Sequence, residues 1–486
     1  MTKKKIGLMI GIVAAIIVLL IGGCMAYDYL FQDLSGMTTA EIEAFKKENP
    51  YVQVSYTVTI EGDSVNVIVD QNTTAVYLEE TAQLTGMIAQ ADYLQHLEAI
   101  HLGDIALTGT ALSQLQDAFP NCLIEYKYIT ILGIDYALDT TEVDLAGMTS
   151  EQVDDVIRDI KQLSNLQAIN LIDADGNASL SLDDAVKLYT AFPDVQFSYA
   201  VDLFGQHVTT DMESLEYFKV NIGDEGLKEL RKLLPMMYNL TYLKLDTCKT
   251  TDEAMAQLRE DFPDIEVHWR IFYSVFNCMT DNYKMWTIGG LMDKQITNFI
   301  HLRGIKYLDL GHNFFTHLDF MENLTDVEVA ILAIGQLEDI SGIKNCTKLT
   351  YLEIFSNRKL DNDDMQNLSG LVNMEYLNIS NIPNMTDLSF TDNMTKLKKL
   401  WCTLSKVPQE EIDRVKALHP DCEFVFLPDG DPTNYGWRTN PDGSYTARYA
   451  LLREQIGYDR DDVSQYPKGE LKEEITYEST GITPDD

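Results

Sequence analysis

The chain has 486 residues, and its 76 acidic side chains outnumber its 37 basic ones, so the formal net charge is −39 at neutral pH. This charge argues against a nucleic-acid-binding protein, which needs a basic face to neutralise phosphates. With 45% hydrophobic and 10% aromatic residues, the sequence can bury a large core and does not have the composition of a disordered acidic chain.

The amino terminus has the pattern of an export signal. Three lysines at positions 3–5 precede an uncharged apolar run over 6–21, and small residues follow it. The quartet Ile21-Gly22-Gly23-Cys24 resembles a bacterial lipobox, which implies lipidation of Cys24. The alternative is an uncleaved anchor over 6–26, which is long enough to span a bilayer. Residues 1–26 are therefore expected to hold the chain on the outer side of a bacterial cell membrane by either route.

A helix that caps the first repeat is expected within 27–50. Thr38, Thr39 and Glu41 form a helix-start pattern, in which a threonine oxygen accepts from the first turn. Pro50 ends this helix, because proline cannot continue within it.

The first half of the chain repeats with a long period. A helix that ends in proline and is followed by an alternating strand recurs at Pro50, Pro120, Pro193 and Pro263, at intervals of 70, 73 and 70 residues. Two further strands are expected within each interval, which makes the array a superrepeat of three units. These strands are expected at 75–78, 97–102, 143–145, 166–171, 215–218 and 240–245. Hairpins are expected around residues 61–63 and around Gly205.

The second half carries a shorter and clearer repeat. The pattern L-x-x-L-x-L begins at residues 305, 327, 349, 374 and 397, and asparagine follows it at Asn313 and Asn357. These residues resemble the leucine-rich repeat, with 337–349 similar to the 22-residue class of bacterial internalins. Residues 240–255, with Cys248 in the place of asparagine, resemble the cysteine-containing class.

This resemblance implies an α/β solenoid over 51–427, with a curved parallel sheet on its concave side and helices and turns on its convex side. Residues 428–486 turn towards Gly, Pro, Asp and Tyr. A C-terminal cap and an acidic disordered tail are expected there, with Tyr449-Ala-Leu-Leu-Arg-Glu as a short helix that closes the last repeat and 435–438 packed on it.

Motifs that carry catalysis, bind a cofactor or hold a structural metal are absent from the sequence, so no enzyme, cofactor or metal is expected. Six cysteines beside Cys24 stand next to strand patterns and are expected to be buried as small hydrophobic side chains. The stretch from Asp173 to Asp184 imitates the start of a calcium loop, but its glycine is misplaced, and a solvated loop is the favoured interpretation.

A partner-binding surface is expected on the concave side of the sheet. Strand side chains alternate between faces, so the residues that flank the strand leucines point away from the core. Rigid exposed aromatics of this kind are typical of protein-binding hot spots, although tyrosine also simply favours strands. The expected contact residues are Tyr242, Tyr307, Tyr351, Phe355, Tyr376, Lys399 and Trp401.

The sequence therefore predicts a non-enzymatic, surface-anchored bacterial leucine-rich-repeat protein that binds an extracellular protein or glycan. A structural lipoprotein of the envelope, whose acidic surface keeps it solvated, is the alternative. A pull-down from envelope extract separates the two, because a scaffold recovers envelope components and a receptor recovers an external ligand.

Overall fold

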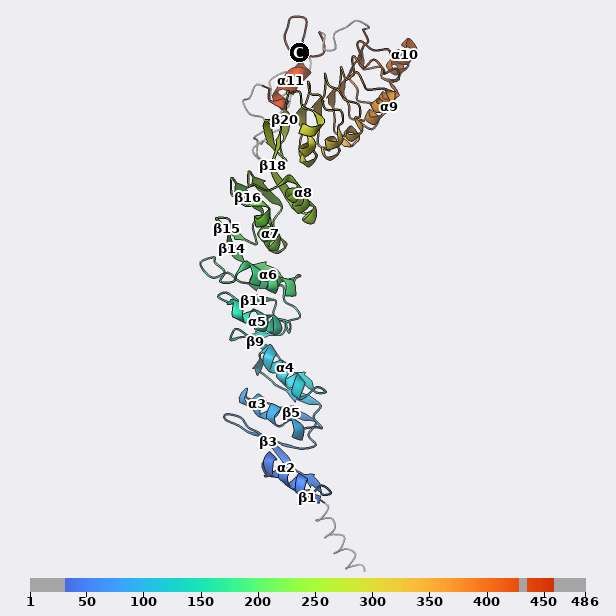
Figure 1. Cartoon of the computed structure of the whole chain (residues 1–486). Coiled ribbons are helices and arrows are strands. Elements are labelled where there is room, and N and C mark those ends of the chain that lie inside the picture. Colours follow the sequence, from blue (N-terminus) through green and yellow to red (C-terminus); the bar gives the residue numbers. More distant parts are fainter. Residues whose placement is uncertain (1–30, 428–434, 459–486) are drawn as a thin grey trace, which may run out of the picture. The chain divides into compact units, whose positions relative to one another are not determined.

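The computed structural model describes residues 31–427 and 435–458 (Figure 1). The expected signal segment, Cys24 and the tail beyond 458 lie outside the described residues. The repeats expected to form one solenoid divide into two compact units. Within the described residues, unit 1 comprises 31–211 and 232–238, and unit 2 comprises 212–231, 239–427 and 435–458. No helix in the described part of the chain is both long and apolar enough to cross a membrane.

Unit 1 opens with the expected helix, α2 (Thr39–Glu48). Thr38 and Glu41 form a capping box, in which each side chain accepts a hydrogen bond from the other's backbone N–H. Ile42 packs this helix onto the core and is fully buried. The chain before the helix, β1 (Phe31–Asp33), runs parallel to β2 (Gln53–Ser55) behind it.

Two three-stranded parallel sheets confirm the superrepeat in unit 1. The middle residue is buried in five of their six strands, as at Val76, Ile100 and Val143, because that position faces the core, and Ile124 of the remaining strand is partly buried. The strands are β5 (Ala75–Tyr77), β6 (Ala99–His101), β8 (Leu123–Glu125), β11 (Glu142–Asp144), β12 (Ala168–Asn170) and β13 (Gln196–Ser198). The helices of these repeats are α3 (Ala82–Ala89), α4 (Gly109–Ala118), α5 (Val153–Ile160) and α6 (Leu182–Ala191).

Antiparallel hairpins interrupt the parallel sheets of unit 1. They are β3 (Thr57–Ile60) with β4 (Val67–Asp70), β9 (Tyr128–Ile131) with β10 (Ile134–Ala137), and β14 (Ala200–Leu203) with β15 (Gln206–Thr209). A short strand, β7 (Ala106–Leu107), pairs with β9. The hairpin turns at Leu132-Gly133 and Phe204-Gly205 have positive φ at both residues, which suits a two-residue connection. Both hairpins expected from the sequence are confirmed.

The first sheet of unit 2 follows the same plan. Three parallel strands, β16 (Ser214–Phe218), β17 (Tyr242–Asp246) and β18 (Glu266–Tyr273), are followed by β19 (Phe276–Met279), which turns back antiparallel to β18. Helices α7 (Gly223–Leu233) and α8 (Asp252–Asp261) connect the parallel strands.

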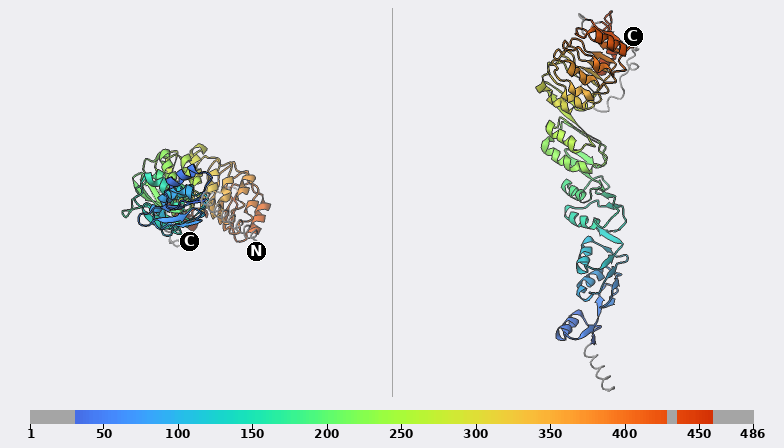
Figure 2. Two further views of the ribbon diagram at one scale, coloured as in Figure 1. Left: turned by 90° about the horizontal axis from the view of Figure 1, so that it is seen from below. Right: turned by 90° about the vertical axis from the view of Figure 1, so that its right-hand side faces the viewer.

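The second sheet of unit 2 contains seven parallel strands without interruption. They are β20 (Lys284–Trp286), β21 (Tyr307–Asp309), β22 (Val329–Ile331), β23 (Tyr351–Glu353), β24 (Tyr376–Asn378), β25 (Lys399–Trp401) and β26 (Glu423–Val425). Short helical segments stack along the other side of this sheet (Figure 2). They are η4 (Asp293–Gln295), η5 (Thr297–His301), η6 (Asp319–Asn323), η7 (Ser341–Asn345), α9 (Asn362–Met365), η8 (Gln366–Leu368), η9 (Ser389–Thr391) and α10 (Gln409–Leu418). The chain thus has an α/β leucine-rich-repeat fold.

Buried asparagines hold the turns that follow the strands. Asn313 donates to the carbonyl oxygens of Thr287 and Leu310, and its side-chain oxygen accepts from Leu291 N–H. Asn357 makes the same three kinds of contact two repeats further along and is fully buried. Each asparagine thus satisfies backbone groups that the turn would otherwise leave unpaired.

Candidate functional site: the concave face of the seven-stranded sheet

The concave face is formed by two rows of side chains that the strand register aligns. In each strand of β20–β26 the middle residue enters the core, and its two neighbours point to the opposite side. One row is Lys284, Tyr307, Val329, Tyr351, Tyr376, Lys399 and Glu423, and the other is Trp286, Asp309, Ile331, Glu353, Asn378, Trp401 and Val425. We call these two rows, together with Phe355 beyond β23, the concave face.

Much of this face is buried, which corrects the expectation that its aromatic side chains are exposed. Tyr307, Tyr351, Phe355 and Trp401 are only 1–3% exposed. They are covered by residues 435–458 of the same chain, which we call the C-terminal segment. The four buried aromatics share one cluster with side chains of this segment, namely Trp437, Tyr449, Leu452 and Ile456. Tyr376 and Lys399 are partly buried against the same segment. The strand alternation correctly indicates the face of these residues, but it contains no information about what covers them.

The helix of the segment, α11 (Ala447–Ile456), exists but does not close the last repeat as expected. It contacts β20 and β21, the first two strands of the sheet, and lies beside β20 in Figure 1. It ends at Gly457, whose φ of 86° is the left-handed cap geometry that glycine adopts without strain. Residues before α11 contact the last strands, so the segment runs back along the face from β25 towards β20.

The start of the segment fits tightly against β25. Lys399 Nζ donates to the Gly436 carbonyl oxygen at 2.7 Å. A Cβ at Gly436 would lie 3.3 Å from the Trp401 ring, and its φ is +102°, so this position requires glycine on two grounds. The Trp437 ring then packs between Tyr351 and Trp401, with ring centroids 5.5 and 5.9 Å away.

Glu353 is the polar centre of the face and is fully buried. Its Oε1 accepts from Trp437 Nε1 at 2.8 Å, from Arg438 Nε at 3.1 Å and from the Tyr351 hydroxyl. Its Oε2 accepts from Arg438 Nη2. Burial opposes the charge of Arg438, but the Glu353 carboxylate raises the pKa of this guanidinium overall. A buried ion pair with both carboxylate oxygens engaged is therefore what fixes the segment at the middle of the sheet.

Asp309 is a second buried acid at the other end of the segment. Its oxygens accept from the Tyr458 hydroxyl and from Gly311 N–H. Burial raises the pKa of Asp309, although both hydrogen bonds act in the opposite direction. Burial and the Asp309 charge also raise the pKa of the Tyr458 hydroxyl. The Tyr458 ring meets Trp286 edge-on at 5.9 Å, and Arg453 lies over it at 5.2 Å.

Tyr242, the expected contact residue on β17, belongs to the first sheet of unit 2. Its hydroxyl donates to Asp281 Oδ2 at 2.7 Å, and burial together with this carboxylate raises its pKa. Beside it, His268 has its pKa lowered to about 4 by burial, against the opposing effect of Asp281. Tyr242 is thus engaged within the protein and lies apart from the cluster formed with the C-terminal segment.

Strand side chains that remain uncovered lie elsewhere, at positions outside the predicted contact residues. In unit 1 the register aligns Tyr77, His101 and Glu125. The Tyr77 ring is 66% exposed and stacks on His101 at 4.3 Å, and His101 Nδ1 lies 2.6 Å from Glu125 Oε2. In unit 2 a cavity of about 320 Å³ over β16–β18 is lined in part by Phe218 and by the Arg270–Asp246 ion pair. The same alternation rule, applied to the upstream strands, could have found both.

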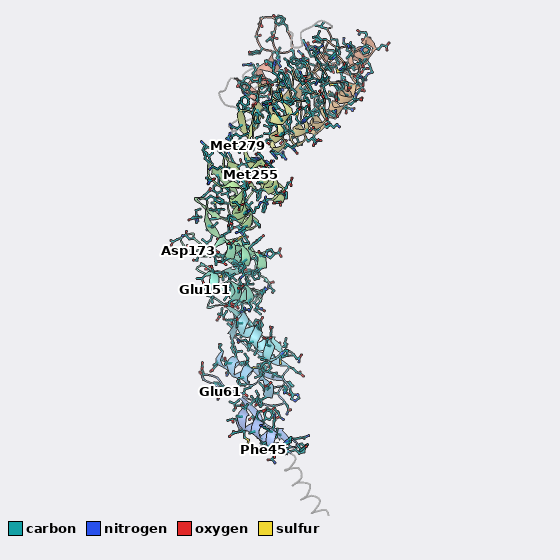
Figure 3. The ribbon with its side chains drawn as sticks, in the orientation of Figure 1. Phe45, Glu61, Glu151, Asp173, Met255 and Met279 are labelled. Carbon is teal, nitrogen blue, oxygen red and sulfur yellow. The ribbon has the colours of Figure 1, made fainter. Side chains whose placement is uncertain are left out.

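The residues considered for metal binding are engaged with the protein. Asp173, labelled in Figure 3, accepts backbone N–H bonds from Asp175 and Asn177 within its own loop. Asp184 accepts from the hydroxyls of Ser150 and Ser181. Within 31–427 and 435–458, no three His, Cys, Asp or Glu side chains are placed to hold a metal ion. Four of the six described cysteines are buried, at Cys248, Cys278, Cys346 and Cys402.

No family model and no curated protein matches the chain. Among solved structures it is similar to an internalin C2 of Listeria monocytogenes, with 23% identity over 31% of this chain and 74% of that one, and a TM-score of 0.25. An internalin F of the same organism gives 16% identity over 84% and 94%, with a TM-score of 0.24. A leucine-rich-repeat protein of Leptospira interrogans gives 14% over 73% and 94%, with a TM-score of 0.25. With identities and TM-scores this low, these similarities carry no argument about ligand or location, and the fold is established by the chain's own strands and turns.

Proposed function

We propose that this chain is a non-catalytic bacterial protein, held on the outer side of the cell membrane, that binds a protein partner through its concave face. The observation that supports this proposal is that the face already binds a polypeptide, the C-terminal segment. It does so with aromatic rings around a charge pair whose carboxylate, that of Glu353, is fully buried, and this composition is typical of interface hot spots.

The chemistry of the face supports binding rather than catalysis. Its two buried acids are engaged with hydrogen-bond donors, Glu353 with Arg438 and Asp309 with Tyr458. A general base needs a proton within reach and a nucleophile beside it. Within the part of the chain that the structure describes, these acids accept hydrogen bonds from tyrosine, tryptophan, arginine and backbone donors rather than from a serine, threonine or cysteine, so the arrangement favours recognition.

Membrane attachment is proposed through Cys24 or, failing that, through residues 6–26. The mass of the amino-terminal fragment from the membrane fraction tests this, with Cys24→Ala as the matched variant. A diacylated fragment starting at Cys24 that is lost in the variant supports lipidation. An intact Met1 with retained membrane binding supports the spanning anchor instead.

Partner binding is tested by crosslinking the intact chain on cells, purifying the protein recovered and measuring its affinity directly. We expect Trp401→Ala, on the concave face, to weaken that affinity about tenfold or more. Tyr77→Ala is the matched control, because it removes an exposed aromatic from a strand of unit 1. Equal affinity for both variants would contradict binding at the concave face, and recovery of structural envelope proteins alone would favour a scaffold.

A further inference from the structure

The backbone ladder beneath the concave face makes no use of the C-terminal segment. Strands β21–β25 pair with one another through their own backbones, and Asn313 and Asn357 fix their turns from within the repeats. None of these bonds involves residues 435–458. The segment therefore adds to a finished sheet and is not needed to form its ladder.

The segment also does not lie where a terminal cap would lie. A terminal cap covers the end of a solenoid, where the last repeat would otherwise expose its core. Here α11 contacts β20 and β21, at the opposite end of the sheet from the last strand, β26. Its position is that of a ligand lying along the binding surface.

The contacts with the segment close long loops in the chain. Trp437 is 84 residues from its acceptor Glu353, and Tyr458 is 149 residues from Asp309. Most of the intervening residues are already folded into the sheet, so the tether is the nine-residue connection between β26, which ends at Val425, and Tyr435. A short tether of this kind provides an effective concentration in the millimolar range. A free ligand of the same chemistry therefore competes with it by mass action.

The chemistry of that ligand follows from the two buried acids. When the segment leaves, Glu353 loses a guanidinium and an indole N–H, and Asp309 loses a tyrosine hydroxyl. A ligand that covers the face again must return a cation to Glu353, because burying an unpaired carboxylate is costly.

We propose that the C-terminal segment is an internal ligand that occupies the concave face, and that the external partner displaces it by presenting a tryptophan–arginine pair to Glu353 and a tyrosine hydroxyl to Asp309. The proposal rests on the proposed function for the existence of a partner. The competition between internal and free peptide can be measured without that partner.

The probe is a fluorescein-labelled synthetic peptide of residues 435–458, added to the full-length chain and followed by fluorescence anisotropy. In the wild type the internal segment competes with the probe. In the double variant Trp437→Ala/Arg438→Ala this competition is weakened, so the probe should bind about tenfold more tightly or better. Adding Glu353→Gln to the double variant should remove that gain, since the probe then lacks its charge partner.

Two results would overturn the proposal. One is equal binding of the probe to wild type and double variant, with far-ultraviolet circular dichroism showing both folded. The other is a double variant whose sheet unfolds, because the segment would then be an integral part of the core. Failure to recover an external partner would leave the peptide competition intact, so the two proposals fail separately.

Discussion

The seven-stranded sheet of unit 2 and the three-stranded sheets of unit 1 use the same repeat and differ in what happens to their outward side chains. Tyr351 and Trp401, in unit 2, are almost fully buried under the C-terminal segment, whereas Tyr77 of unit 1 is 66% exposed. Glu353 is buried in an ion pair, whereas the Glu125 side chain is 55% exposed beside His101. The strand register determines which face of the sheet a side chain occupies. Whether that face is exposed to solvent depends on a segment distant in the sequence, here residues 435–458.

The largest expected effect comes from removing the buried acid. Glu353→Ala leaves Arg438 without its carboxylate, so α11 should detach more readily, by about 3 kcal/mol, which is roughly a hundredfold loss of hydrogen-exchange protection. Protection of β21–β25 should persist, because their ladder does not use the segment. Hydrogen exchange with mass spectrometry measures both regions at once.

Glu125→Ala is the matched substitution in unit 1. It removes an exposed carboxylate from an equivalent strand end, where the contact with His101 is solvated. The expected change in protection of β6 and β8 corresponds to less than about 1 kcal/mol. Equal effects of the two substitutions would show that cover by the segment does not distinguish the two sheets.

The repeats were predictable because each is specified locally, whereas the cover was not. The leucine spacing, Asn313 and Asn357 all act within one or two turns, and the structure confirms them. The cover depends on Trp437 and Tyr458, which lie outside any repeat and bind strands 84 and 149 residues away. Their only trace in the sequence is a group of tyrosines and arginines in a polar tail, which indicates no particular binding site.

A buried histidine should give unit 2 a distinctive acid sensitivity. The pKa of His268 is lowered to about 4 in the folded chain, mainly by burial, against about 6.5 when unfolded. Its neutral form thus stabilises the fold above pH ~6.5, and this stability is lost as the pH falls through about 4. A shift of this size corresponds to a loss of about 3 kcal/mol.

His268→Gln should flatten the dependence of the unfolding free energy on pH between about 6.5 and 4. The difference in unfolding free energy between variant and wild type separates the contribution of His268 from that of other titrating groups. All four tryptophans, at 269, 286, 401 and 437, lie in unit 2, so their fluorescence during urea unfolding reports on this unit alone. A difference that does not change between pH 7 and pH 4 would contradict burial of a neutral His268.

Asp309 should respond to pH in the opposite direction, and the effect should be smaller. Burial under the segment raises its pKa, so the docked state favours the protonated carboxyl. Docking is therefore strongest at pH below the ordinary aspartate value and weakens as the pH rises through the docked pKa. Asp309→Asn should stabilise docking at neutral pH by about 1 kcal/mol and remove this dependence. Hydrogen exchange of the α11 amides, corrected for the intrinsic exchange rate at each pH, measures the stability of docking. Weaker docking in the variant than in the wild type would show that the docked state prefers the charged carboxylate.

The smallest expected effect concerns the turns after the strands. One residue in each of these turns has a positive φ, and the backbone strain this causes depends on the type of its side chain. His312, Ile334, Ser356, Asn381 and Leu404 all have positive φ, between 52° and 61°. A β-branched residue is a genuine outlier in this conformation, whereas asparagine tolerates it. Ile334 is 41% exposed, so it loses little packing on substitution. Ile334→Asn should therefore raise the unfolding free energy of unit 2 by about 0.5–1 kcal/mol.

Asn381→Ile is the reverse exchange at the equivalent turn, and it should lower the unfolding free energy by a similar amount. The backbone N–H of Ile334 donates to the carbonyl oxygen of Phe355, and that of Asn381 donates to the carbonyl oxygen of Thr403. Neither substitution removes these backbone hydrogen bonds between successive repeats. Urea midpoints from tryptophan fluorescence decide the matter. If both substitutions destabilise, the contacts of each native side chain outweigh backbone strain, and the turns are adapted to their residues one by one rather than by a common conformational rule.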